Sequence, residues 1–154
     1  MSRQLRAQAL TRGAEELGLL PGPEHPNVFG MVMETGYPEA VATLVVFAEG
    51  STSLYFSTGG GVIGAGEHES VRATHRPFFA EAEARLGLFS KAVDTPLPAV
   101  GRVRFYARTF AGTLTAEADE DDLGEMQHGL SALFHAGHDV ITAVRYVSEL
   151  GNDD

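Results

Sequence analysis

The pattern that most constrains the fold of this chain is the strict alternation of apolar and polar residues between positions 102 and 118. Two runs, Arg102–Thr109 and Thr113–Ala118, flank an Ala111-Gly112 turn, which is typical of a β-hairpin with one buried face. A two-residue turn sets Arg108 opposite Thr115 and directs six apolar side chains to the same face: Val103, Phe105, Ala107, Leu114, Ala116 and Ala118. The hairpin therefore predicts a sheet with one face covered by other elements.

Three more strands are predicted upstream, at residues 28–34, 40–48 and 52–57. These runs are rich in β-branched and aromatic residues and are separated by turn residues. The turn between the second and third strands needs an odd number of residues, such as Ala48-Glu49-Gly50. Only then do the apolar side chains of both strands share a face, namely Leu44, Val46, Leu54 and Phe56.

Helices are predicted at residues 2–20, 67–86 and 131–150 from the spacing of their apolar side chains. Pro77 lies inside the second of them and should kink it or begin a new helix. The expected architecture is α+β, with the order α-βββ-α-ββ-α and a five-stranded, mostly antiparallel sheet whose helices pack on one face. Residues 1–154 are expected to form a single domain, in which residues 1–27 supply the N-terminal helix and a linker.

The composition limits the classes of function. The chain has 21 acidic and 11 basic residues, a net charge of −10, which argues against nucleic acid as a partner. No apolar run approaches the roughly 18 residues of a membrane span. The absence of cysteine excludes disulfides and thiolate catalysis. We expect a cytoplasmic protein without a cofactor, acting as a homodimer with a protein partner whose surface is basic.

The segment from Gly59 to Gly66 contains five glycines in eight residues. Residues 59–64 match the G-x-G-x-x-G pattern of dinucleotide-binding loops, yet the surrounding strands predict an antiparallel meander and not a β-α-β unit. Glu67 and Glu69 at the start of the following helix would also repel a phosphate. A loop with a structural role is the favoured interpretation. The ligand-binding alternative uses Gly59, Gly60, Gly61, Gly64 and His68.

A cationic stripe on one strand face is the strongest polar candidate for a functional site. Arg102, Arg104 and Arg108 alternate along the strand with Tyr106 between them. Such a stripe could hold a carboxylate or phosphate ligand. Ion pairs with Glu117 and Asp119 across the hairpin are the favoured explanation, and Arg104, Tyr106 and Arg108 are the ligand-binding candidates.

Histidines supply the remaining candidates. His135, His138 and Asp139 lie close together on the last predicted helix and could hold a divalent metal, although an exposed helix face or a subunit contact explains them better. His75 lies on the apolar side of the second helix and is expected to be a hydrogen-bonded core histidine.

These observations favour a non-catalytic interaction or regulatory module, because no complete catalytic set is present. The alternative is a small-ligand-binding domain or small enzyme that uses the 59–66 glycine loop, His68 and the arginine stripe. A closed pocket uniting those groups would favour the alternative.

Overall fold

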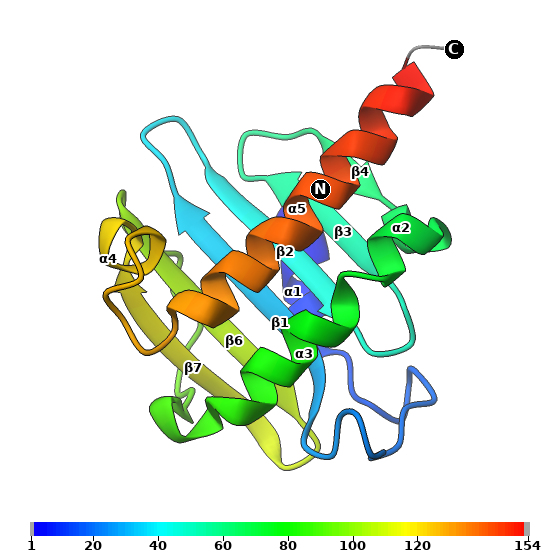
Figure 1. The fold of residues 1–154 in the computed structure, drawn as a ribbon, viewed down its shortest axis with the longest axis vertical. Helices are drawn as coiled ribbons and strands as arrows, with labels where there is room; N and C mark the ends of the chain where they lie inside the picture. The colour runs from blue at the N-terminus through cyan, green and yellow to red at the C-terminus, as the bar shows by residue number, and fades with distance from the viewer. Residues whose placement is uncertain (1, 153–154) are drawn as a thin grey trace.

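A seven-stranded antiparallel sheet with the order β4-β3-β2-β1-β6-β7-β5 lies at the centre of the molecule (Figure 1). It is seen in a computed structural model that describes residues 2–152. The elements in chain order are α1 (Ser2–Thr11), β1 (Val28–Gly36), β2 (Val41–Phe47), β3 (Thr52–Phe56), β4 (Gly61–Ile63), the 3₁₀ turn η1 (Ala65–Glu67), α2 (Glu69–Arg72), α3 (His75–Ala84), the 3₁₀ turn η2 (Leu86–Leu88), β5 (Ser90–Lys91), β6 (Arg102–Thr109), β7 (Gly112–Asp119), α4 (Glu120–Gly124) and α5 (Ser131–Asn152). The fold class is α+β, as predicted.

The hairpin of β6 and β7 confirms the predicted faces but not the predicted turn. Thr109 pairs with Gly112, so the turn is Phe110-Ala111 and Arg108 lies opposite Thr113. The predicted pairing is therefore displaced by two residues, which leaves every side chain on its predicted face. Phe110 packs against Phe29 with ring centroids 5.5 Å apart, a contact that holds it in the turn.

The turn between β2 and β3 is as predicted. Leu44 pairs with Leu54 and Val46 pairs with Thr52, which leaves the three-residue turn Ala48-Glu49-Gly50. Leu44, Val46 and Leu54 share one buried cluster as a result.

The sheet has seven strands where five were predicted, because two short edge strands escape the sequence pattern. β4 has three residues and β5 has two, too few to show an alternation of apolar side chains. The predicted second helix is also divided into η1, α2 and α3, and Pro77 lies in the first turn of α3, where a missing amide is tolerated.

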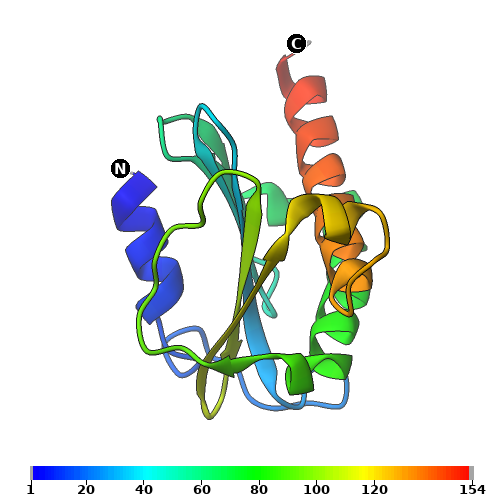
Figure 2. The same ribbon diagram turned by 90° about the vertical axis from the view of Figure 1, so that its left-hand side faces the viewer.

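Helices cover both faces of the sheet, which corrects the prediction of a single covered face. α3 and α5 pack on one face, whereas α1 and the segment between β5 and β6 lie on the other (Figures 1 and 2). The first face carries the larger core, which includes Met31, Met33 and Phe78. The α1 face buries a second cluster, which includes Val32 and Val45.

No helix within residues 2–152 is both long enough and apolar enough to span a bilayer.

Candidate ligand-binding site

Five polar side chains form a continuous row across the α1 face of the sheet. Cross-strand pairing joins them in the order Tyr55 (β3), Thr43 (β2), Glu34 (β1), Arg104 (β6) and Glu117 (β7), and we call this set the polar row. Val32, Val45 and Tyr106 flank it on one side and belong to a buried apolar cluster. Polar groups in such a setting need partners, because an unpaired buried polar group raises the free energy of the folded state.

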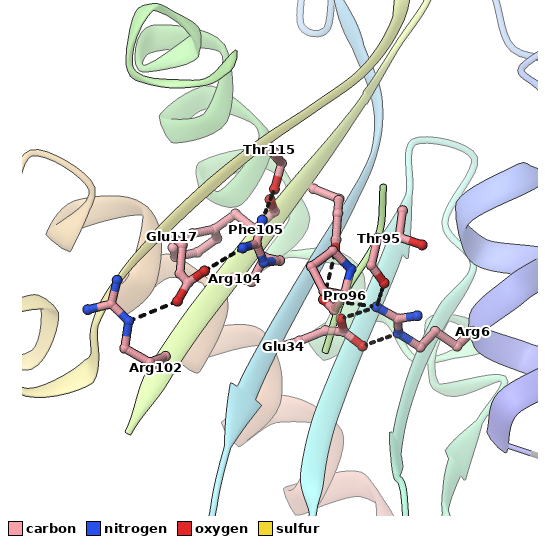
Figure 3. A network of polar contacts seen from close by, with 10 residues as sticks. Arg6, Glu34, Thr95, Pro96, Arg102, Arg104, Phe105, Thr115 and Glu117 are labelled. Atoms are coloured by element: carbon pink, nitrogen blue, oxygen red, sulfur yellow. Dashed lines mark hydrogen bonds and ion pairs between the residues drawn. The ribbon is translucent and has the colours of Figure 1, made fainter. Parts of the chain in front are cut away.

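Glu34, at the centre of the polar row, is fully buried and pairs with Arg6 of α1. Nε and Nη2 of Arg6 donate to the two carboxylate oxygens over 2.8 and 2.9 Å (Figure 3). Thr43 Oγ1 donates to the same carboxylate over 2.7 Å. Burial opposes the charge of Arg6, but the hydrogen bond and charge of Glu34 outweigh it and raise the pKa of the guanidinium. This two-point ion pair ties α1 to the sheet.

The segment before β6 also contacts this ion pair. Arg6 Nη2 donates to the carbonyl oxygen of Thr95 over 2.7 Å, and the Tyr106 hydroxyl donates to that of Pro96 over 2.9 Å. These two hydrogen bonds hold the loop in place beside the polar row, where it forms one wall.

The other end of the polar row contains part of the predicted arginine stripe. Arg102 and Arg104 both donate to the carboxylate of Glu117 (Figure 3). The hydrogen bond from Arg102 is the main influence that lowers the pKa of Glu117, and the charges of both arginines add to it against the opposing effect of burial. Asp119, the second predicted partner, instead caps α4 by accepting from the amides of Asp121 and Asp122.

Arg108 is buried and holds α1 in place. Its Nη1 donates to the carbonyl oxygen of Ala9 over 2.6 Å, its Nε donates to Thr113 Oγ1 over 3.0 Å, and its guanidinium lies 5.1 Å from the ring centre of Phe29. Burial lowers the pKa of Arg108, and the charge of Glu16 opposes this effect. The contacts of Arg108 are therefore with the protein itself.

A cavity of about 470 Å³ opens between α1 and the Tyr55 end of the polar row. The side chains that line it come from α1, from β2 and β3, and from the segment before β6: Arg3, Arg6, Ala7, Leu10, Thr11, Val41, Thr43, Tyr55, Ser57, Thr95 and Leu97. This volume lies in the range of small-molecule sites, about 300–1,000 Å³. The lining combines aliphatic groups with hydroxyls and guanidiniums.

The hydroxyl of Tyr55 is the unusual atom of this cavity. It is buried and has no hydrogen-bond partner among the described residues. Burial is the main cause that raises the pKa of Tyr55, and the Glu34 carboxylate raises it further, so this hydroxyl stays protonated and available as a donor. Tyr55 lines this cavity together with Arg6 and Thr43. Nearly all buried hydroxyls have a partner, so this one is an unsatisfied donor on a residue that lines the cavity.

The glycine loop lies in a different part of the sheet. Gly59 and Gly60 form the exposed turn between β3 and β4, and both have positive φ. A Cβ at Gly61 would overlap the backbone of Leu54 and Tyr55, so close approach of the strands requires glycine here. Gly64 precedes η1, and His68 is exposed just before α2. Three strands separate β4 from the arginines on β6, so the structure does not unite these groups in one pocket.

The histidines of α5 lie on the opposite face of the sheet from α1. His135 and Asp139 are exposed, whereas the ring of His138 packs on Phe134 with centroids 4.4 Å apart. Burial and the nearby His135 lower the pKa of His138. No group of three or more potential ligands gathers to hold a metal ion anywhere in residues 2–152. The proposed metal site therefore gains no support.

A second cavity, of about 560 Å³, brings together two of the predicted site residues. Gly61 and His138 both line it, between β4 and the later turns of α5. Nε2 of His138 is also buried without a partner among the described residues, but His138 as a whole residue is more exposed than Tyr55. The cavity under α1 is the stronger candidate for this reason.

His75 confirms the prediction of a hydrogen-bonded core histidine. It is buried, and its Nε2 lies 2.8 Å from Thr52 Oγ1. Burial and the charge of Arg72 lower its pKa.

The sequence pattern identified Arg104 and Glu117 of the polar row but not Glu34, Thr43 and Tyr55, nor Arg6, the partner of Glu34 on α1. One signal was available, since Glu34 is a charged residue in an otherwise apolar strand. A charge at such a position is rare unless it is paired.

Comparisons of this chain with protein-family models, curated proteins and solved structures found no match.

Proposed function

We propose that this chain is a non-catalytic regulatory module that binds a small organic ligand in the cavity between α1 and the sheet. The observation that carries the proposal is the buried, unpartnered hydroxyl of Tyr55 beside that cavity. Leaving such a group unpaired destabilises a protein by about 1–3 kcal/mol, and a bound ligand oxygen or nitrogen would remove that penalty.

The chemistry of the lining supports binding in preference to catalysis. Its polar side chains are arginine, threonine, serine and tyrosine, with no histidine, aspartate or glutamate among the lining residues described. These groups orient a ligand by donating hydrogen bonds. Glu34 beneath them is already paired with Arg6 and Thr43, so it is not free to act as a general base.

The position of α1 supports a regulatory role. Ala9 is the one residue of α1 that is buried among those whose burial the structure describes, and Leu5 and Leu10 are only partly buried against the sheet. Arg6 and Arg108 add hydrogen bonds that join the helix to the sheet. A ligand beneath so lightly packed a helix would shift how α1 sits on the sheet. Such a shift would move the outer surface of α1, and the protein partner expected from the sequence would bind that surface differently.

The proposal is tested by a thermal-shift screen with small organic acids, alcohols, amides and amines, followed by calorimetric titration of each compound that stabilises the protein. Ala7→Leu places added bulk in the cavity and should weaken binding of these compounds. Ala80→Leu is the matched control, because Ala80 is exposed on α3 at the other face. Equal affinity for both variants, or the absence of any stabilising compound, would refute the proposed function.

A further inference from the structure

We infer that the ligand of the α1 cavity carries two polar ends: a neutral hydrogen-bonding oxygen that meets Tyr55 inside and an anionic group that meets Arg3 at the opening. An aliphatic body joins the two ends. This inference rests on the proposed function of the cavity and adds the chemical class of its ligand.

The outer end is assigned from the charge at the opening. Arg3 lines the cavity and is exposed, and it forms no ion pair or hydrogen bond within residues 2–152. The charged residues among those lining the cavity are Arg3 and Arg6, both positive, in a chain with a net charge of −10. A cationic opening on an acidic protein attracts anions and repels cations.

The inner end is assigned from the charge beneath the cavity. Glu34 is fully buried, its carboxylate acts on Tyr55, and Arg6 is already committed to it. A second anion placed beside Tyr55 would have no free cation next to it and would lose its hydration. A neutral hydroxyl or carbonyl oxygen avoids this penalty and accepts the hydrogen bond of Tyr55.

The body of the ligand is assigned from the walls between these two ends. Leu10, Val41 and Leu97 come from α1, from β2 and from the segment before β6, and all of them line the cavity. They offer aliphatic surface with no aromatic ring other than Tyr55 itself among the lining residues described. A flexible aliphatic chain fits such walls without a stacking partner.

Three compounds of equal chain length separate the two ends: ω-hydroxyoctanoate, octanoate and α,ω-octanediol. We expect ω-hydroxyoctanoate to bind most tightly in calorimetric titrations of the full chain. Its advantage over octanoate should be about fivefold, as for one neutral hydrogen bond. Its advantage over the diol should be about threefold, as for one exposed ion pair, and should diminish with added salt.

Two variants test which residue causes each difference in affinity. Tyr55→Phe should abolish the advantage over octanoate, and Arg3→Gln should abolish the advantage over the diol. Arg12→Gln is the matched control for Arg3→Gln, because Arg12 is an exposed arginine just after α1 that does not line this cavity. It should leave all three affinities unchanged.

The outcomes separate this inference from the proposed function. If the diol binds as tightly as ω-hydroxyoctanoate, or if Arg3→Gln retains the preference, the anionic end is wrong while the cavity remains a binding site. If all three compounds fail to bind although screened compounds bind and Ala7→Leu weakens them, this ligand class is wrong and the proposed function stands. If nothing binds, both are wrong.

Discussion

Tyr55 and Tyr106 are buried tyrosines on the same face of the sheet, and they differ in one hydrogen bond. The Tyr106 hydroxyl donates to the carbonyl oxygen of Pro96, whereas the Tyr55 hydroxyl has no partner in the described part of the chain. The pair therefore provides an internal comparison between a hydroxyl that stabilises the fold and one that the fold leaves free.

Removing these two hydroxyls should change stability in opposite directions. Tyr55→Phe should raise the free energy of unfolding by about 1 kcal/mol, because it deletes an unsatisfied buried group. Tyr106→Phe should lower it by about 1 kcal/mol, because it deletes a formed hydrogen bond. Urea denaturation of the two variants and the native protein measures both values. Destabilisation by Tyr55→Phe would mean that its hydroxyl has a partner in solution.

The pKa of His75 makes stability depend on pH. An unfolded histidine takes up its proton near pH 6.5, whereas burial lowers the pKa of His75 in the folded state. Below about pH 6.5 the unfolded chain therefore binds more protons than the folded one, and the free energy of unfolding falls as the pH falls. His138 adds to this trend, since its pKa is also lowered.

His75→Gln should make the loss of stability between about pH 7.5 and 5.5 smaller, because glutamine does not titrate there and can still hydrogen-bond Thr52. Urea denaturation across this pH range measures the slope. His68→Gln is the control, because His68 is exposed, and it should keep the native slope. An unchanged slope for His75→Gln would show that His75 titrates normally in the folded protein.

At the scale of elements, α1 is attached by a small apolar contact and a few polar ones. Arg6 joins it to Glu34, and Arg108 donates to the Ala9 carbonyl near its C-terminal end, where a cation also complements the helix dipole. A helix attached in this way should open locally without unfolding the sheet.

Arg108→Gln should increase amide hydrogen exchange in residues 3–11 by about tenfold, as expected from the loss of one charge-assisted hydrogen bond of 1.5 kcal/mol or slightly more. Exchange in α5 should not change, because α5 packs on the opposite face. Arg104→Gln serves as the comparison, since Arg104 bonds Thr115 and Glu117 and not α1. Mass spectrometry of the exchanged protein measures each segment. Equal protection of α1 in the native protein and Arg108→Gln would contradict this account of its attachment.

β1 and β2 contain the signal that would have predicted a covered second face. Apolar residues occupy both alternating sets in them, as Val32 lies between Met31 and Met33, and Val45 lies between Leu44 and Val46. Runs of this kind are typical of strands buried on both faces. The hairpin of β6 and β7 alternates more cleanly, and for that reason its faces could be predicted from sequence.

The polar row could not be assembled from the sequence. Its members lie on five strands, and only the pairing of those strands sets Tyr55, Thr43 and Glu34 side by side. Arg6 reaches them from a helix 28 residues before Glu34. Long-range contacts of this type depend on register and helix docking, which the local spacing of residues does not specify.

At the scale of the whole molecule, the excess of acidic groups should govern the response to salt. The chain has 21 acidic and 11 basic residues, so its surface charges repel one another on balance. Raising sodium chloride from about 0.01 M to 1 M shortens the screening length from ~30 to ~3 Å.

We therefore expect the melting temperature to rise over this range, with most of the rise below about 0.2 M, where screening changes most. Calorimetric scans at several concentrations measure the effect. Potassium chloride at the same concentrations should give the same curve if screening is the cause. A constant or falling melting temperature would show that attractive surface pairs outweigh the net repulsion.

The attachment of α1 also bears on the order of events when this protein is synthesised. Its contacts with Thr95 and Arg108 join residues 89 and 99 positions apart, so the helix leaves the ribosome long before its docking surface exists. β1 likewise cannot complete its pairing until β6, one of its two neighbours in the sheet, has been synthesised. During translation the first helix must remain undocked until β6 has emerged. The cavity beneath α1 consequently cannot form until the segment before β6 has also been synthesised.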